Sequence, residues 1–203
     1  MKKHITLFAI ILFTFSANIS FAQANANNVV KTIAKSFRDK KNAEIIFDYH
    51  YEINADTPPK IQQGTAYLQG ESYKMLLEEQ QTISDGQTIW TYLIDEEEVI
   101  ISSTSVGDDN TPLKLLTSLD KYYSATFTDK SNIVLSNPDG QFKLITLTID
   151  PKNITLKAIV FIADDGSKMV IEIKETKFDQ DLKDGFFTFD EKAHPDVDII
   201  DMR

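Results

Sequence analysis

The chain has 203 residues, of which 42% are hydrophobic, and its 21 basic and 31 acidic side chains give a net charge of −10. This length suits a single domain with a core of its own. The acidic balance argues against nucleic acid and anionic membranes as partners, because both attract basic patches. The chain contains no cysteine, which excludes disulfides and thiolate metal sites.

The first 22 residues have the pattern of a secretory signal peptide. Two lysines, Lys2 and Lys3, precede an apolar run from Ile5 to Phe15, and a small-x-small motif ends at Ala22. The apolar run is shorter than the ~20 residues of a spanning helix. We expect cleavage near Ala22 and a mature domain, residues 23–203, in the periplasm. The signal peptide holds two of the basic residues and no acid, so the mature chain carries −12.

The mature chain opens with one amphipathic helix. Asn25 to Asn28 can cap this helix. The apolar residues then recur at helical spacing, and they are Val29, Val30, Ile33, Ala34 and Phe37. We expect this apolar stripe to pack on a sheet. A second short helix is predicted after Pro112, because proline suits the first helical position and leucines follow it.

The rest of the chain reads as short strands separated by turns. Period-two alternation and Gly, Pro, Asn and Asp at the turns predict the strands Ile45–Ile53, Ile61–Gln69, Tyr73–Leu77, Thr82–Ser84, Ile89–Ile94, Val99–Ser102, Ile133–Leu135, Phe142–Ile149, Ile154–Ile162, Met169–Glu175 and Phe186–Phe189. Residues 196–203 are expected to form a last edge segment. Strands at this spacing predict an antiparallel sheet that curls into a barrel or half-barrel.

The stretch Thr82 to Ile94 is the strongest local signal. Asp85-Gly86 is a hairpin signal, because glycine adopts a positive φ without steric cost. The strand that follows contains Trp90, the only tryptophan, and is apolar on both faces. This pattern predicts a strand that is covered on both sides, or that lines an apolar site on one side.

No residue pattern in the mature chain points to catalysis. His50 lies between Asp48 and Glu52 on the polar face of a predicted strand, a spacing that a metal could use. Solvated charges on an exposed face are the ordinary interpretation of that pattern, so no metal site is assigned. The chain has no glycine-rich phosphate loop and no G-x-S-x-G motif. We therefore expect a protein that is not an enzyme and needs no cofactor.

Large apolar side chains are the remaining candidates for function. We expect a ligand-binding apolar cavity lined by Phe47, Tyr49, Tyr73, Met75, Trp90 and Tyr92. Strand alternation supports the first four, whereas the inward face of the strand with Trp90 and Tyr92 stays open. A curled sheet under helices can enclose such a cavity, which would bind acyl chains at about 0.8 kcal/mol per buried CH₂. The alternative is that these side chains simply fill a core.

The sequence resembles the periplasmic outer-membrane lipoprotein carrier (LolA) family. I-S-D-G-Q-T-I-W-T-Y at residues 83–92 is similar to V-S-D-G-K-T-L-W-F-Y in that family. T-P-L-K-L-L at 111–116, F-T-F at 187–189 and P-D-V-D-I-I-D at 195–201 follow in the family's order. No single motif is long, and the resemblance rests on their order along nearly the whole mature chain.

This resemblance implies a mainly β fold with some α: a single antiparallel sheet curled into an unclosed β-barrel. The N-terminal helix and the short internal helix would form a lid over an apolar cavity. It implies a periplasmic chaperone that binds the acyl chains of lipoproteins and shuttles them from the inner to the outer membrane. The implied partners are acylated lipoproteins and an inner-membrane ATP-binding-cassette extractor. An outer-membrane acceptor stays open, and we expect a monomer.

One departure from the family pattern affects the lid. The family has a K-R-P-x-x-F-x-W stretch whose arginine latches the lid, and this chain has Q-G-E-S-Y-K-M at 69–75 without an arginine. The cavity is therefore held more loosely here or latched differently. Two alternatives to the lipoprotein carrier are a periplasmic carrier of another lipid and an envelope sensor or interaction domain on the same half-barrel.

Overall fold

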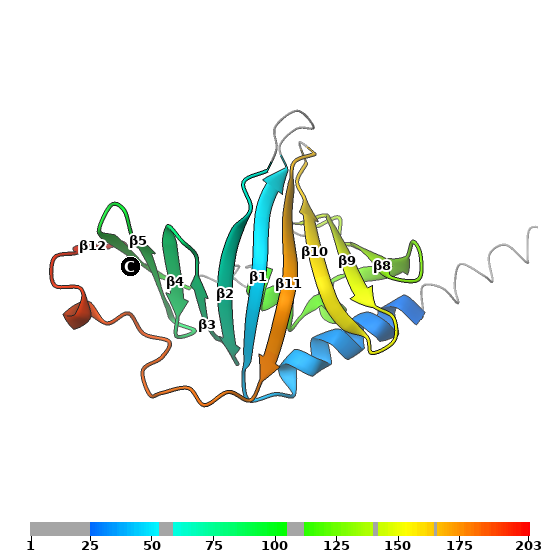
Figure 1. Cartoon of the computed structure of the whole chain (residues 1–203), viewed down its shortest axis with the longest axis horizontal. Coiled ribbons are helices and arrows are strands. Elements are labelled where there is room, and N and C mark those ends of the chain that lie inside the picture. Colours follow the sequence, from blue (N-terminus) through cyan, green and yellow to red (C-terminus); the bar gives the residue numbers. More distant parts are fainter. Residues whose placement is uncertain (1–24, 53–58, 105–111, 140–141, 165) are drawn as a thin grey trace, which may run out of the picture.

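The computed structural model describes residues 25–52, 59–104, 112–139, 142–164 and 166–203. In this part of the chain, twelve strands form one sheet in the order β12-β6-β5-β4-β3-β2-β1-β11-β10-β9-β8-β7. Neighbouring strands are antiparallel except β12 and β6, which run parallel. Figure 1 shows the sheet curved but open at both ends, which confirms the expected mainly β, unclosed fold.

The sheet is assembled from two meanders that meet at its centre. The first meander contains β1 (Ala43–Glu52), β2 (Gln62–Gln69), β3 (Ser72–Leu76), β4 (Gln80–Ser84), β5 (Thr88–Leu93) and β6 (Glu98–Ser103). The second contains β7 (Ser124–Phe127), β8 (Asn132–Ser136), β9 (Leu144–Asp150), β10 (Thr155–Ile162) and β11 (Lys168–Phe178). The first strand of the first meander, β1, pairs with the last strand of the second meander, β11, and this pair joins the two meanders.

Helical segments cover one face of this sheet. The N-terminal helix spans residues 25–38, so the asparagines expected as its cap are already helical. The predicted internal helix is two short pieces, α2 (Pro112–Leu115) and α3 (Leu119–Tyr122), which link the two meanders. In the described residues, no helix has both the length and the apolar character needed to cross a bilayer.

Within the described ranges, the buried side chains form two separate clusters. The larger cluster joins the apolar stripe of the N-terminal helix, the leucines of α2 and α3 and the inward residues of β1, β2 and β8 to β10. The smaller cluster contains Ile83, Trp90, Tyr92, Val99, Ile101 and Phe189. Phe189 belongs to residues 179–203, which run from the end of β11 to the edge strand β12 (Asp198–Asp201) (Figure 1).

The predicted strand Phe186–Phe189 is wrong. Backbone bonds from Phe186 N to Lys183 O and from Thr188 N to Gly185 O make this segment a run of turns. Its aromatic side chains serve as anchors instead: the ring centroid of Phe186 lies 4.8 Å from that of Tyr67. Apolar content alone could not distinguish an anchored loop from a strand.

The expected edge segment is confirmed as β12, whereas β7 was not predicted.

Candidate functional site

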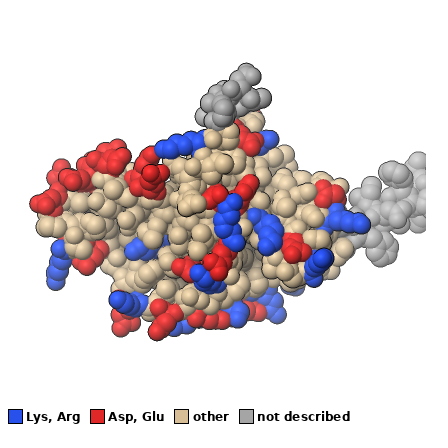
Figure 2. Space-filling view, viewed as in Figure 1, with Lys and Arg blue, Asp and Glu red and all other residues tan. Residues whose placement is uncertain are grey.

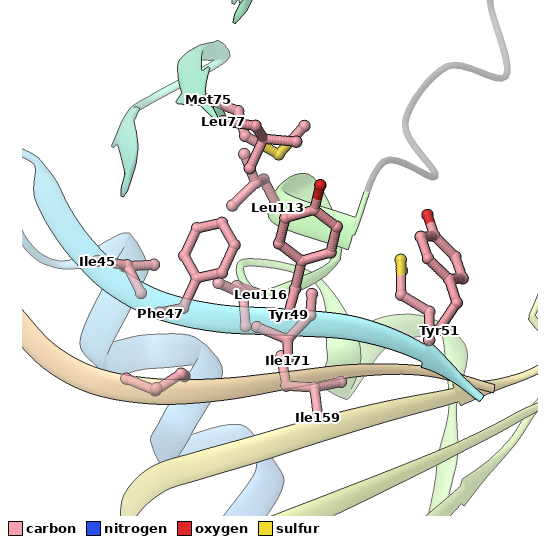
Figure 3. Close-up of a pocket in the computed structure, with 12 residues that line it drawn as sticks. Ile45, Phe47, Tyr49, Tyr51, Met75, Leu77, Leu113, Leu116, Ile159 and Ile171 are labelled. Carbon is pink, nitrogen blue, oxygen red and sulfur yellow. The ribbon is translucent and has the colours of Figure 1, made fainter. Parts of the chain in front are cut away.

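An apolar cavity of about 250 Å³ lies between the helix-covered face of the sheet and the α2 segment. Figure 3 shows side chains from β1 and β11 pointing into it from one side and those from β3 and α2 from the other. The lining residues are Ile45, Phe47, Tyr49, Tyr51, Met75, Leu77, Leu113, Leu116, Ile159, Met169, Ile171 and Ile173. None of them carries a charge, so the cavity suits an uncharged apolar ligand.

Strand register explains why these side chains meet. Phe47 is opposite Ile173, Tyr49 is opposite Ile171, and Tyr51 is opposite Met169 across the β1–β11 pair. Directly opposed residues in an antiparallel pair project on the same face of the sheet. The alternation in β1 therefore places every second residue on the cavity side and sends its polar residues to the other face.

Three of the six predicted ligand-binding residues line the cavity: Phe47, Tyr49 and Met75. Tyr73 lies on the same face of β3 as Met75, but it is only 3% exposed and packs within the larger core cluster. The structure therefore gives Tyr73 the surroundings of a core residue.

Trp90 and Tyr92 lie on the opposite face of the sheet from the cavity. Met75 is opposite Thr82, and Thr82 is opposite Thr91, so Thr91 lies on the cavity side of β5. The ring of Tyr92 instead packs against Phe189, with centroids 5.6 Å apart. Aromatic content suggested a ligand surface here, but these rings are covered by the C-terminal segment.

Nine lining residues were not predicted. Leu113 and Leu116 follow helical spacing, which reads equally well as core. Met169, Ile171 and Ile173 alternate along β11, a signal of one apolar face that sequence alone could detect. What sequence could not supply was the pairing of β11 with β1, which brings together segments more than 100 residues apart.

Among the described lining side chains, the polar atoms are the hydroxyl groups of Tyr49 and Tyr51. The Tyr49 hydroxyl donates a hydrogen bond to Oε1 of Gln62, and burial is the main cause that raises the pKa of Tyr49. Tyr49 is therefore neutral at physiological pH and adds no charge to the wall. Tyr51 is 57% exposed although it lines the cavity, so it marks the side that opens to solvent.

Arg38 ties the N-terminal helix to the α2–α3 segment. Its Nη1 and Nη2 atoms donate to Oδ1 and Oδ2 of Asp120 at 2.6 and 2.9 Å, and Nη1 also donates to the carbonyl oxygen of Thr117 at 2.6 Å. The hydrogen bond from Arg38 is the main cause that lowers the pKa of Asp120. Because Leu113 and Leu116 belong to this segment, the Arg38–Asp120 bridge fixes part of the cavity wall.

The face of β1 that points away from the cavity is polar. Asp48 pairs with Lys174 at 2.8 Å, Glu52 pairs with Lys168 at 3.3 Å, and His50 lies 3.4 Å from Glu52. In the part of the chain that the structure describes, no group of three or more His, Asp or Glu residues is arranged to hold a metal. The carboxylates beside His50 thus have lysine partners.

Two comparisons of the sequence with known proteins point to the same family. The family model described as "Outer membrane lipoprotein carrier protein LolA" matches residues 77–190. An outer-membrane lipoprotein carrier protein of Haemophilus influenzae is 27% identical, with 100% of this chain and 99% of that protein covered. A protein of the same name from Francisella tularensis subsp. novicida is 26% identical, with 99% and 98% covered.

Solved structures share the fold at much lower identity. A crystal structure of an uncharacterized conserved protein from Thermus thermophilus has a TM-score of 0.54 and 12% identity. The match covers 87% of this chain and 99% of that chain. At this identity the likeness concerns the fold alone.

Proposed function

The chain belongs to the LolA family of outer-membrane lipoprotein carriers, and from this we propose that it is a periplasmic carrier of lipoproteins. It binds the acyl chains of its cargo in the apolar cavity and shuttles the cargo from the inner to the outer membrane. The proposed partners are acylated lipoproteins and an inner-membrane extractor of the ATP-binding-cassette class. Phe47, Tyr49 and Met75 are the predicted residues that we propose contact the acyl chains.

The observation that carries this proposal is the uncharged lining of the cavity. Twelve side chains from four strands and the α2 segment face one space, and the polar atoms among these side chains are two tyrosine hydroxyls. An acyl chain in water exposes apolar surface, and each CH₂ moved into this cavity would gain about 0.8 kcal/mol. A hydrocarbon chain fits a lining without charge.

Release of the cargo requires that the free energy gained by burying its acyl chains can be overcome. The cavity wall contributed by Leu113 and Leu116 belongs to a segment held by side-chain bridges, Arg38 to Asp120 and Lys114 to Glu71, rather than by continuous sheet pairing. Side-chain bridges open at lower cost than strand ladders, since few bonds must break together. The lid is therefore the part of the wall that moves when cargo enters or leaves.

Mass spectrometry of the protein purified gently from the periplasm tests the cargo. Acylated lipoproteins bound at a defined ratio are the expected result. Free lipid at the same ratio would assign the cavity to another lipid and overturn the lipoprotein proposal. If the purified protein contains no bound ligand and also fails to bind an apolar fluorescent probe, no carrier function would have a basis.

A charged substitution in the cavity tests the site. Met75→Glu should reduce binding of the apolar probe by at least about tenfold, because an ionised carboxylate resists burial among apolar groups. Met75 is partly exposed, so its replacement is less damaging than a change at Tyr73, which is buried. The matched control is Gln63→Glu, which adds the same charge at an exposed position on the other face of the sheet.

A further inference from the structure

The edge strand β12 leaves one side of its backbone unpaired. It pairs with β6 on one side and ends the order of strands among the described residues. Asp198 N donates to Glu97 O at 2.9 Å, and Met202 N donates to Ile101 O at 2.8 Å. In a parallel pair the N–H and C=O groups of alternate residues point to the same neighbour. The N–H and C=O groups of Ile199 and Asp201 therefore point away from the sheet.

Apolar side chains accompany this open edge. Ile199 is 47% exposed, Ile200 is 42% exposed and Met202 is 69% exposed. Ile199 is opposite Val99 on the face of the smaller core cluster, whereas Ile200 is opposite Ile100 on the cavity face. Natural proteins usually protect an edge strand with lysine, proline or a covering element, because it can pair with another strand. Here both faces of the edge strand offer apolar contacts instead.

Acidic side chains surround the same edge. Figure 2 shows acidic groups gathered over the end of the molecule where Figure 1 places β5 and β12. The exposed or partly exposed acids of this end are Asp95, Glu96, Glu97, Glu98, Asp196, Asp198 and Asp201. Among the described residues, the ion pair found in this group is that of Asp201 with Arg203 at 2.7 Å. The other carboxylates are available to a basic partner.

We propose that β12 is a docking edge for a basic, extended segment of a partner protein, which adds a strand beside Ile199 and Asp201. Main-chain hydrogen bonds would supply affinity, and alternate basic side chains would meet the acidic surround. This interaction concerns the outer edge of the sheet and does not depend on what the cavity holds.

Charge disfavours a second copy of this chain as the occupant. A two-fold pair of β12 strands would run antiparallel and would bring together two edges of the same acidic charge, each carrying Asp198 and Asp201. Like charges at such a contact repel, and their cost grows because no described cation besides Arg203 pairs with them. The partner that fits this edge must therefore carry the opposite charge.

Binding of two labelled peptides to the mature protein tests the proposal. One peptide alternates lysine and valine, and its matched control alternates glutamate and valine. The basic peptide is expected to bind by fluorescence anisotropy, with an affinity that falls as salt increases. In hydrogen exchange measured by NMR, it should newly protect the amides of Ile199 and Asp201, while that of Ile200 stays protected as in the free protein. Equal binding of both peptides, or no new protection at Ile199, would overturn the proposal.

A backbone substitution separates strand addition from general charge attraction. Ile199→Pro removes an outward N–H while the bonds from Asp198 and Met202 to β6 stay available, and should weaken binding by about tenfold. Ile199→Val, which keeps the N–H, should bind normally. The protection of the Ile200 amide shows whether β12 stays paired in the proline variant. Unchanged binding by a proline variant with β12 intact, or a dimer that protects Ile199 without peptide, would contradict this partner.

Discussion

At Gly64 the chain passes so close to the ring of Phe47 that a Cβ atom there would lie 2.5 Å from Cζ of the ring. The same Cβ would lie 2.8 Å from Cδ2 of Leu77, a second cavity residue. A side chain at this position must push both groups aside. Because both line the cavity, glycine at position 64 leaves room for the ligand as well as for the ring.

Gly64→Ala should therefore lower both the stability and the ligand affinity. Displacing packed side chains costs about 1–3 kcal/mol, and the displaced ring would occupy cavity volume. Chemical denaturation and titration with an apolar probe measure the two effects. Gln63→Ala, one residue away on the opposite face, is the control and should change neither. A Gly64→Ala protein with the parent's stability and affinity would show that the ring has free space elsewhere.

Tyr67 lies on the face of the sheet away from the cavity and should make the free energy of unfolding depend on pH. Burial, followed by a hydrogen bond from its hydroxyl to Glu44, raises the pKa of Tyr67 to about 12. The folded state thus favours the neutral phenol, and this stabilisation is complete below the unfolded pKa of about 10. It should be lost as pH rises from 10 through 12. Unfolding free energies across this range should fall more steeply in the parent than in Tyr67→Phe.

At the scale of elements, the bridge between Arg38 and Asp120 ties the N-terminal helix to the α2–α3 segment. The stretch at 69–75 has no arginine, so a latch was expected to be looser or different. We propose that the bridge from the N-terminal helix to α3 serves as this latch. Sequence could not identify it, because Arg38 and Asp120 are more than 80 residues apart and each reads as a solvated charge.

Loss of this bridge should loosen the lid. Arg38→Ala removes three hydrogen bonds from a partly buried pair and should cost about 1–3 kcal/mol of stability. It should also raise the dissociation rate of an apolar probe, measured by stopped-flow fluorescence. Lys35→Ala on the same helix removes an exposed pair with Asp39 and is the matched control. Equal dissociation rates in both variants would mean that the bridge does not control the lid.

The same bridge should weaken in acid. The pKa of Asp120 is lowered in the folded protein, chiefly by the hydrogen bond from Arg38. Its contribution is therefore present above the unfolded pKa of about 4 and is lost as pH falls through the lower folded value. Probe dissociation should accelerate in that acidic range in the parent protein. Arg38→Ala, which already lacks the bridge, should show a smaller acceleration.

At the scale of the whole molecule, the sequence predicted which segments form the sheet better than which face of each strand lines the cavity. Alternation in β1 placed Phe47 and Tyr49 on the cavity side, because period two is a local property. The apolar strand β5 gave no such guide, since both of its faces carry apolar residues. Which face looked inward was decided by the register of β3, β4 and β5 and by Phe189 covering the other side. The contact of Phe189 with Tyr92 is long-range in the sequence, and no local pattern encodes it.

The single tryptophan can test this two-sided arrangement. Trp90 lies in the smaller cluster on the face away from the cavity. Loading the cavity with an acyl ligand should therefore leave the emission maximum of Trp90 nearly unchanged. Phe189→Ala opens the smaller cluster, should cost about 3–5 kcal/mol, and should shift the emission to longer wavelength. Met75→Glu, on the cavity side, should weaken loading without shifting the emission of Trp90. A ligand-dependent emission shift in the parent protein that is absent in Met75→Glu would contradict this arrangement. It would show that a ligand in the cavity changes the surroundings of Trp90 on the other face of the sheet.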